Sequence, residues 1–378
     1  MNTTATSIFA EPTPETAVVA SSDSAEAIKS LRILAVSALW QGANDYAFVR
    51  AFRRAGHSVQ VVSERDFIPS WRSAALRLLR KGLKERLAGN YNQALVETAR
   101  VFSPDLFFVF KGANVYAATI GAIKAGGAIA IQFYPDVSFR THGPFLPKAL
   151  PQFDWVLTTK SFGLADMATQ LGVHSASFLP HAYDPETHRP LPCTQKDAAQ
   201  YACDASFIGN WSAKKQGFLS ALTNALPSLD MKIWGPAAWR SAGQSAACFQ
   251  DYPVFGDEYA KAVQLSCINI ALLSEARTGS SSGDLITART FEIPAAGGFM
   301  MHERTEEAMQ YFKDGKECAF FDGPDDLVEK VRYYLAHDEE RRAIAEAGHR
   351  RCMTSGYSVD DRARAVVEKY HELRRARG

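Results

Sequence analysis

"LRILAVSALWQGANDYAFVRAFRRAGHSVQVVS", residues 31–63, is the stretch that indicates the fold. Residues 31–39 carry a single charge among aliphatic side chains, which is typical of a strand buried in a parallel sheet. A short polar loop leads into an amphipathic helix at residues 46–57, which Gly56 closes, and residues 57–63 form the next strand. A strand, a helix and a second strand in this order predict an α/β fold with a parallel sheet covered by helices.

The same alternation continues along most of the chain. It stops at residues 181–202, which hold three prolines and many polar side chains, and restarts at residue 203. Ligands of such sheets bind beyond the carboxyl ends of the strands, so we expect a site in a cleft between two domains. The predicted parts are a disordered tail (1–30), a first Rossmann-like domain (31–180), a linker (181–202), a second Rossmann-like domain (203–355) and a final helix (356–378).

Composition excludes several classes of protein. The 378 residues are 47% hydrophobic with a formal net charge of +1, so no overall field attracts nucleic acid. The six cysteines form no C-x-x-C pair and the histidines show no metal-ligand spacing, which favours reduced thiols in a cytoplasmic protein without a bound metal. The first 30 residues lack the features of a signal peptide, and no apolar run approaches the ~20 residues of a membrane span.

The densest set of candidate binding residues lies after the first strand of the second domain. Gly209 and Asn210 end that strand, and Lys214 and Lys215 begin the next helix. Glycine allows close approach of backbone to a ligand, and a helix N-terminus with a lysine favours an anion such as a diphosphate. The alternative is an ordinary tight turn followed by solvated lysines.

Two other loops of the second domain are candidates for the donor site. Trp234 and Gly235 end the next strand, where an aromatic ring beside a glycine suits a base pocket, although a core tryptophan fits equally well. The loop at residues 274–284, "SEARTGSSSGD", offers Ser281 and Ser282 to phosphate or sugar hydroxyls, or is simply flexible.

The stretch "DLITARTFEIPAAGG", residues 284–298, places a glutamate among apolar neighbours, which is costly unless the carboxylate is paired or used. If the segment is helical, Asp284 and Glu292 lie near one face, with Arg289 available for phosphate. Structural roles remain open for both acids, with Asp284 as a helix N-cap and Glu292 as a partner of Arg289. Pro294 argues against a long continuous helix.

The first domain supplies candidate residues for the acceptor side. Trp40 and Asn44 follow its first strand, and Asp136, Arg140 and His142 follow a later one. Asp136 or His142 is placed to orient or deprotonate an acceptor, whereas a purely structural role is the alternative for each.

Residues 71–90, "WRSAALRLLRKGLKERLAGN", carry six basic residues and one acidic residue, with leucines at helical spacing. A basic amphipathic helix is able to rest on an anionic membrane surface, so peripheral membrane contact is one expectation. A solvated helix is the other.

Several segments together resemble the CgeB-like glycosyltransferases of the GT-B fold. They are "SFIGNW", "CINIALL", "ARTFEIPAAGGFMM", "HDEERRAIAEAG" and "YSVDDRARAVVEKY", and the similarity covers roughly residues 200–370. The first domain matches in architecture alone.

The resemblance implies two Rossmann-like domains, a nucleotide-sugar held by the second, and a last helix that crosses back to the first. Related retaining transferases carry an E-x7-E motif, whose second acid binds the donor ribose and whose first contacts the transferred sugar. Glu292 matches the second position, and Asp284 matches the first with a shorter acid. Gly297 and Gly298 would then turn the helix end into the next strand.

The expected function is therefore glycosyl transfer from a nucleotide-sugar, independent of metal and of any cofactor, with retention of configuration. The acceptor is a glycan, a lipid-linked glycan, a protein or a small molecule. Alternatives on the same fold are a sugar-nucleotide epimerase and a non-catalytic protein that binds nucleotide-sugars or acts in assembly.

Overall fold

The computed structural model describes residues 30–40, 42–68 and 80–378, and Leu31–Gly378 form one compact unit. Residues 1–29 of the predicted tail (1–30) and residues 71–79 of the basic segment lie outside the described residues. The expectations of disorder and of membrane contact therefore stay predictions.

The first sheet has six parallel strands in the order β2-β1-β3-β4-β5-β6. Its strands are β1 (Arg32–Val36), β2 (Ser58–Val62), β3 (Leu106–Phe110), β4 (Ile129–Tyr134), β5 (Trp155–Thr158) and β6 (Ala176–Phe178). The connecting helices are α1 (Asn44–Arg54), α3 (Arg80–Phe102), α4 (Ala117–Ala125), α5 (Leu146–Ala149) and α6 (Gly163–Leu171).

The second sheet has five parallel strands in the order β11-β10-β9-β7-β8. Its strands are β7 (Cys203–Ile208), β8 (Met231–Trp234), β9 (Ser266–Ala271), β10 (Met300–Glu303) and β11 (Ala319–Phe321). The helices of this part are α7 (Gln195–Tyr201), α8 (Ala213–Ala225), α9 (Asp257–Leu265), α10 (Arg289–Ala295), α11 (Glu306–Met309), α12 (Gly323–Ala336) and α13 (Asp338–Thr354).

Burial on both faces explains why β1, β3 and β4 of the first sheet are almost continuously apolar. Successive side chains of a strand point to opposite faces. In β1, Ile33 and Ala35 join the core cluster on one face, whereas Leu34 and Val36 join the cluster on the other. A charge at any of these positions would be buried, so the sequence of the strand has little freedom.

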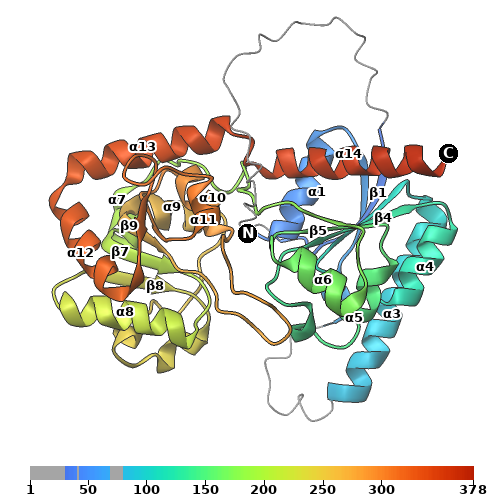
Figure 1. The fold of residues 1–378 in the computed structure, drawn as a ribbon, viewed down its shortest axis with the longest axis horizontal. Coiled ribbons are helices and arrows are strands. Elements are labelled where there is room, and N and C mark those ends of the chain that lie inside the picture. Colours follow the sequence, from blue (N-terminus) through green and yellow to red (C-terminus); the bar gives the residue numbers. More distant parts are fainter. Residues whose placement is uncertain (1–29, 41, 69–79) are drawn as a thin grey trace, which may run out of the picture. The chain divides into compact units, whose positions relative to one another are not determined.

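The last helix, α14 (Val359–Arg377), returns to the first sheet and runs alongside α1 (Figure 1). Val359, Ala363, Val366 and Tyr370 lie at helical spacing and are buried in the same cluster as α1 and β1. The Ser358 side chain and Asp361 form a capping box that starts the helix. The predicted architecture of two Rossmann-like domains with a crossing C-terminal helix is confirmed.

Candidate active site

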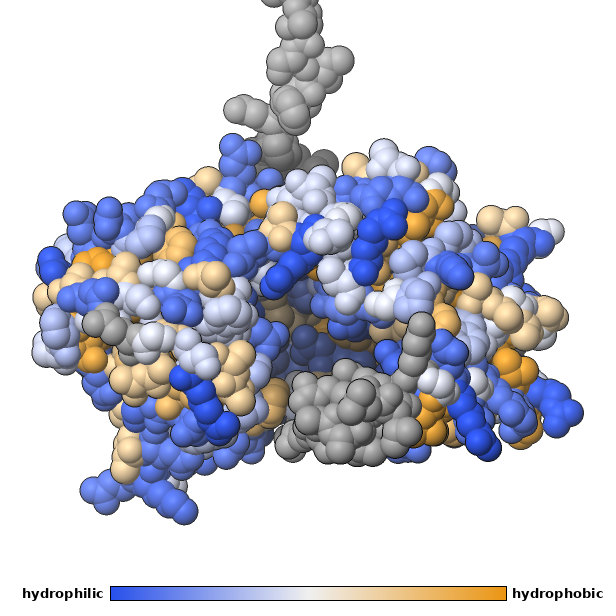
Figure 2. Space-filling model, turned by 90° about the horizontal axis from the view of Figure 1, so that it is seen from below, coloured by the Kyte–Doolittle hydropathy of each residue, from blue (hydrophilic) through white to orange (hydrophobic). Residues whose placement is uncertain are grey.

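A cavity of about 880 Å³ lies between the two sheets, at the carboxyl ends of their strands. Figure 2 shows this face, where a hollow surrounded largely by hydrophilic residues separates the two halves. Parallel strands present their following loops at one edge, so both sheets contribute to the lining. Of the predicted site residues, the cavity is lined by Trp40, Asn44, Asp136, His142, Asn210, Lys215, Asp284 and Arg289.

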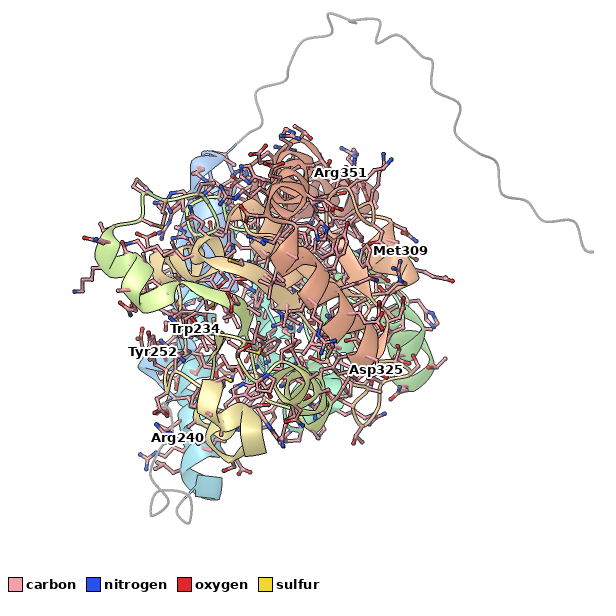
Figure 3. The ribbon with its side chains drawn as sticks, turned by 90° about the vertical axis from the view of Figure 1, so that its left-hand side faces the viewer. Trp234, Arg240, Tyr252, Met309, Asp325 and Arg351 are labelled. Atoms are coloured by element: carbon pink, nitrogen blue, oxygen red, sulfur yellow. The ribbon has the colours of Figure 1, made fainter. Side chains whose placement is uncertain are left out.

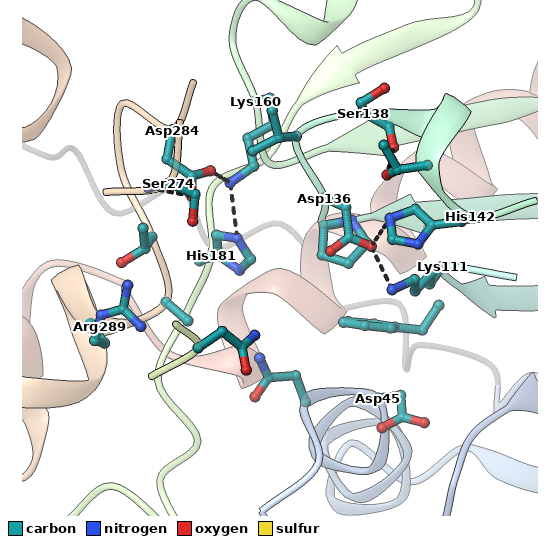
Figure 4. Close-up of a pocket in the computed structure, with 18 of the residues that line it drawn as sticks. Asp45, Lys111, Asp136, Ser138, His142, Lys160, His181, Ser274, Asp284 and Arg289 are labelled. Carbon is teal, nitrogen blue, oxygen red and sulfur yellow. Dashed lines mark hydrogen bonds and ion pairs between the residues drawn. The ribbon is translucent and has the colours of Figure 1, made fainter. Parts of the chain in front are cut away.

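The acceptor wall, as we call Lys111, Asp136 and His142, comes from the first sheet (Figure 4). Lys111 follows β3, whereas Asp136 and His142 follow β4. Lys111 Nζ lies 2.9 Å and His142 Nε2 3.1 Å from the same oxygen, Asp136 Oδ2. Burial by itself would raise the pKa of Asp136, but the contacts with His142 and Lys111 outweigh it and lower that pKa below its ordinary value. The wall thus holds an ionised carboxylate with two partners.

Two other predicted acceptor-side residues lie at the rim of the first sheet. Asn44 is the first residue of α1. The Trp40 ring packs edge-on against Phe255 of the second domain, with ring centroids 4.7 Å apart. Trp40 therefore contacts both domains beside the acceptor wall.

The donor wall, as we call Lys215 and Arg289, comes from the second sheet. Lys215 Nζ lies 3.1 Å from Ser274 Oγ, and Arg289 donates to the backbone carbonyls of Ile208 (3.2 Å) and Leu272 (2.7 Å). Burial, followed by the repulsion of Arg289, lowers the pKa of Lys215 to about 8. Within the described part of the chain, neither cation forms an ion pair.

The N-terminus of α8 is not the open anion site that the sequence suggested. Ser212 Oγ accepts from the backbone N–H of Lys215 (3.3 Å), and Glu275 Oε1 accepts from that of Lys214 (3.2 Å). These two N–H groups are already bonded to side chains of the protein. The amine of Lys215 is therefore the cationic group that α8 offers to the cavity.

The floor of the cavity joins the domains through a buried ion pair, formed by Lys160 after β5 and Asp284 from the second domain. Their Nζ and Oδ1 atoms lie 2.6 Å apart, and both side chains are less than a tenth exposed. Burial would raise the pKa of Asp284, but Lys160 outweighs it and lowers that pKa. His181 Nε2 lies 3.4 Å from Lys160 Nζ, and burial, followed by the charge of Lys160, lowers the pKa of His181 to about 3.

The two acids of the D-x7-E spacing do not share a helix face. Helix α10 begins at Arg289 with Ala288 as its N-cap, so Asp284 lies in the preceding loop and neither the helical arrangement nor the N-cap role holds. Asp284 is fixed instead by Lys160 and by the backbone of Ser274. The intrahelical pairing of Glu292 is not formed either, because Arg289 donates to carbonyls.

Glu292 does not line the cavity. It is 8% exposed and lies beside the linker, where its Oε1 atom is 3.9 Å from His188 Nε2. The Tyr259 side chain also lies close to Glu292. Burial, and then the negative charge of Glu292, raise the pKa of Tyr259 well above its ordinary value. The ribose contact that the family resemblance implies stays a prediction.

Other predicted donor residues have structural surroundings. Lys214 Nζ lies 2.5 Å from Glu303 Oε1, away from the cavity lining. Trp234 is fully buried in the core, which was the alternative for this residue (Figure 3). At Gly235 a Cβ would lie 2.3 Å from the carbonyl oxygen of Gly209, so this glycine brings two strand ends together rather than approaching a ligand.

A similar fit explains Gly209, where a Cβ would lie 2.7 Å from Arg289 Nη1. Gly297 has a φ of +83° just after α10 and leads the chain into β10. The predicted tight turn at Gly297 is confirmed, but this residue lies outside the cavity lining.

The middle of the serine-rich loop docks on the first domain, whereas Ser274, Arg277 and Asp284 of the same loop line the cavity. Ser281 N donates to Asp166 Oδ2 (2.9 Å), and Gln170 Nε2 donates to the carbonyl of Gly279 (2.9 Å). Arg140 donates to Gln170 and packs so closely on Gly279 that a Cβ there would lie 2.4 Å from Arg140 Cδ. The sequence predicted a site that includes Ser281, Ser282 and Arg140. None of them lines the cavity, because the contact between the loop and the first domain holds this region elsewhere.

The sequence reasoning missed several residues of the cavity. Lys111 and Lys160 each follow a strand at its carboxyl end, the same signal that identified Asp136, so both were within reach. His181 belongs to the predicted linker and carried no signal. Other lining residues that were not singled out include Asp45, Ser274, Arg277 and Thr287.

Two absences concern metal and membrane. Within residues 30–40, 42–68 and 80–378, no group of three His, Cys, Asp or Glu side chains is arranged to hold a metal ion. Nor is any helix in the described ranges long and apolar enough to cross a membrane.

Comparison with known proteins finds a similarity in the second domain. Residues 214–368 match a family model described as glycosyl transferase-like, and this segment contains both residues of the donor wall. Curated protein sequences gave no significant match.

Solved structures match over nearly the whole chain. Sucrose-phosphate synthase from Thermosynechococcus elongatus has a TM-score of 0.65 at 11% identity, over 92% of this chain and 100% of that one. The Anabaena protein HepE, in complex with UDP-glucose, has a TM-score of 0.58 at 12% identity, over 90% and 100%. A putative UDP-N-acetylglucosamine 2-epimerase from Listeria monocytogenes has a TM-score of 0.54 at 11% identity, over 91% and 97%.

The fold is GT-B. At these identities the likeness shows the fold alone, and the GT-B fold accommodates an epimerase as well as transferases. The finer resemblance to CgeB-like enzymes stays a prediction, and the choice among activities depends on the residues of the cavity.

Proposed function

We propose that this protein transfers a glycosyl group from a nucleotide-sugar to an acceptor hydroxyl, without a metal ion. One observation carries the proposal: a single cavity holds Lys215 and Arg289, which form no ion pair with any described residue, on one wall and an imidazole–carboxylate pair on the other. The glycosyl transferase-like match over residues 214–368 and the UDP-glucose complex of HepE support a nucleotide-sugar as donor.

The donor wall fits the leaving group of such a reaction. Breaking the glycosidic bond of a nucleotide-sugar releases a diphosphate, on which negative charge develops. Lys215 and Arg289 point donors at the cavity from fixed positions, and preorganised cations of this kind stabilise a developing anion. Cationic side chains here would take the part that a metal ion takes elsewhere, which supports metal independence.

The acceptor wall fits the attacking group. His142 Nε2 faces Asp136, which leaves Nδ1 as the ring atom able to take a proton from an acceptor hydroxyl. Asp136 would orient the ring and stabilise the imidazolium that forms. The acceptor enters beside Trp40 and Asn44, and its class, whether glycan, lipid-linked glycan, protein or small molecule, is left open by these contacts.

Two observations bear on stereochemistry and point in different directions. The D-x7-E spacing predicts retention, and Asp284 does reach the cavity, where the transferred sugar would lie. The His142–Asp136 pair favours inversion, because direct displacement needs an enzyme base on the acceptor side. The anomeric configuration of the product, read by NMR, decides between them.

The donor is identified by a thermal-shift screen against nucleotides and nucleotide-sugars. A ligand that binds the folded state at 100 times its Kd stabilises it by about 2.7 kcal/mol. We expect a shift with at least one nucleotide-sugar, weakened about 10- to 100-fold in affinity by Lys215→Met, since a charge-assisted contact contributes roughly 1.5–3 kcal/mol.

The matched control is Lys214→Met, one residue away, whose amine pairs with Glu303 outside the cavity. This variant should bind like the wild type. Equal losses in both variants, or no shift with any nucleotide-sugar, would contradict the donor site.

Incubation of the bound donor with an acceptor panel then separates the candidate activities. Release of nucleotide that depends on an acceptor supports the transferase. Isomerisation of the donor without an acceptor supports the epimerase, and tight binding without turnover supports the binding or assembly protein.

A further inference from the structure

Lys111 has a backbone conformation that its side chain does not favour. It follows β3 with a φ of +61°, in the left-handed region that residues other than glycine seldom occupy. Such conformations persist where the surrounding structure enforces them, and they gather at functional sites.

Two hydrogen bonds from β4 hold Lys111 in place. Its N–H donates to the carbonyl of Phe133 (2.8 Å), and Gln132 Nε2 donates to its carbonyl (2.6 Å). Gln132 is fully buried, a setting in which a polar side chain is expensive unless it is used. The strained residue is therefore specified by its neighbours on the adjacent strand.

The result of this conformation is a contact with the acceptor wall. Lys111 Nζ lies 2.9 Å from Asp136 Oδ2, and His142 Nε2 lies 3.1 Å from the same oxygen (Figure 4). A lysine and a histidine thus share one carboxylate oxygen, all three at the cavity lining.

We propose that Lys111 is a positioning residue of the acceptor wall, which holds the Asp136 carboxylate in place and moderates its pull on the His142 proton. This inference rests on the proposed function for the role of His142. With two partners on one oxygen, Asp136 stabilises a protonated His142 less than it would alone. The imidazole then stays free to take an acceptor proton and to release it again.

Other charged side chains surround these three residues, and their identities are the same in every variant of Lys111. Asp45 comes from the first turn of α1, Glu64 from the turn after β2, and His181 from the linker. Glu64 accepts from Asn114 Nδ2 (2.8 Å), and it also feels the charges of Lys84, Lys111 and Asp45. A change in titration behaviour between variants of Lys111 therefore reports Lys111.

The test needs no substrate, because diethyl pyrocarbonate reacts with a histidine only when its imidazole is neutral. Modification of the peptide that carries His142 is followed by mass spectrometry between pH 5 and pH 9, in the wild type and in Lys111→Met, Lys111→Arg and Lys111→Gly. We expect the profile of Lys111→Met to move to higher pH by about one unit, the size of effect that one neighbouring charge produces. Lys111→Arg should stay close to the wild type.

Lys111→Gly separates positioning from a purely structural role. Glycine suits a positive φ, so this variant should keep or raise the melting temperature while its His142 profile moves as in Lys111→Met. The exposed Lys148→Met, on α5, should change neither quantity.

A His142 profile that is the same in Lys111→Met, Lys111→Gly and the wild type would overturn the inference. If the wild type transfers sugar but the His142 profiles are unchanged, the inference about Lys111 is refuted and the proposed function stands. If the profiles shift but the wild type transfers no sugar to any acceptor, the proposed function is refuted and the effect of Lys111 on His142 stands. Once a donor and an acceptor are known, the acid limb of the kcat/KM profile should move with the modification profile.

Discussion

The two walls of the cavity carry charge in opposite ways. On the acceptor wall, Asp136 is bound by both Lys111 and His142, so the charges of that wall satisfy one another. On the donor wall, Lys215 and Arg289 form no ion pair within the described ranges: Lys215 contacts a hydroxyl, and Arg289 contacts backbone carbonyls and the Phe207 ring.

This difference indicates what each wall lacks. Paired groups need no ligand to be satisfied, and their contacts instead fix the geometry for a proton transfer. Cations bonded only to neutral groups remain attractive to an anion, and burial increases that attraction. Under the proposed function, the donor wall would bind the nucleotide-sugar and the acceptor wall would carry out the proton transfer, and the following predictions test that division.

The largest expected effect is on turnover, from loss of the imidazole. His142→Ala and Asp136→Asn should each lower kcat by about 10²- to 10⁴-fold, the usual range for a general base, while nucleotide affinity stays within about twofold. The measurement is initial rate together with the nucleotide-induced thermal shift. His174→Ala, an exposed histidine of the same domain, is the control. A parallel loss of affinity would show that the walls do not divide the work.

The next largest effect concerns the pair at the floor. Lys160→Met leaves Asp284 charged, buried and without its cation, which typically costs about 3–5 kcal/mol of unfolding free energy. Urea denaturation measures the loss. The double variant Lys160→Met/Asp284→Asn should recover at least half of it, because the stranded charge is then removed. If Lys160→Met costs less than about 1 kcal/mol, the pair is not buried in solution.

The smallest effect is a pH dependence of nucleotide binding. Because burial holds the pKa of Lys215 at about 8, its charge is lost as the pH rises through that value, and affinity for UDP should fall about fourfold between pH 7 and pH 8.5. The unfolded chain keeps this proton up to about pH 10, whereas the folded protein loses it near pH 8. Between these two values the unfolded state binds more protons, so the free energy of unfolding of the free protein rises with pH as the buried charge is removed.

Calorimetry in buffers of different ionisation enthalpy provides the check. Proton uptake on binding near pH 8 is expected for the wild type and Lys214→Met, and its absence is expected for Lys215→Met. Uptake that survives in Lys215→Met would assign the proton to another group.

Much of the fold was predictable from residues close together in the chain. The apolar run of residues 31–39 predicted β1, because a strand buried on both faces has few positions for charge. The alternation of strands and helices predicted two parallel sheets, and the amphipathic spacing of the last helix is compatible with its packing on α1.

The site was predictable in part, for a related reason. Asp136, Asn210 and Lys215 follow strands, and the carboxyl ends of parallel strands meet at one edge. Lys111 and Lys160 carry the same signal, but a lysine after a strand also suits a solvated loop. Only the folded chain shows that both amines turn inward to carboxylates.

The sequence by itself determined the order of strands and helices, and so the edge of each sheet at which a site forms. Tertiary structure decided which charges are paired. Lys214 and Lys215 are neighbours, yet the helix turns them by about 100°, one toward Glu303 and the other toward the cavity. Asp284 meets Lys160 from the other domain, and Glu292 lies beside the linker. Such pairings depend on distances between residues far apart in the chain, which local spacing does not encode.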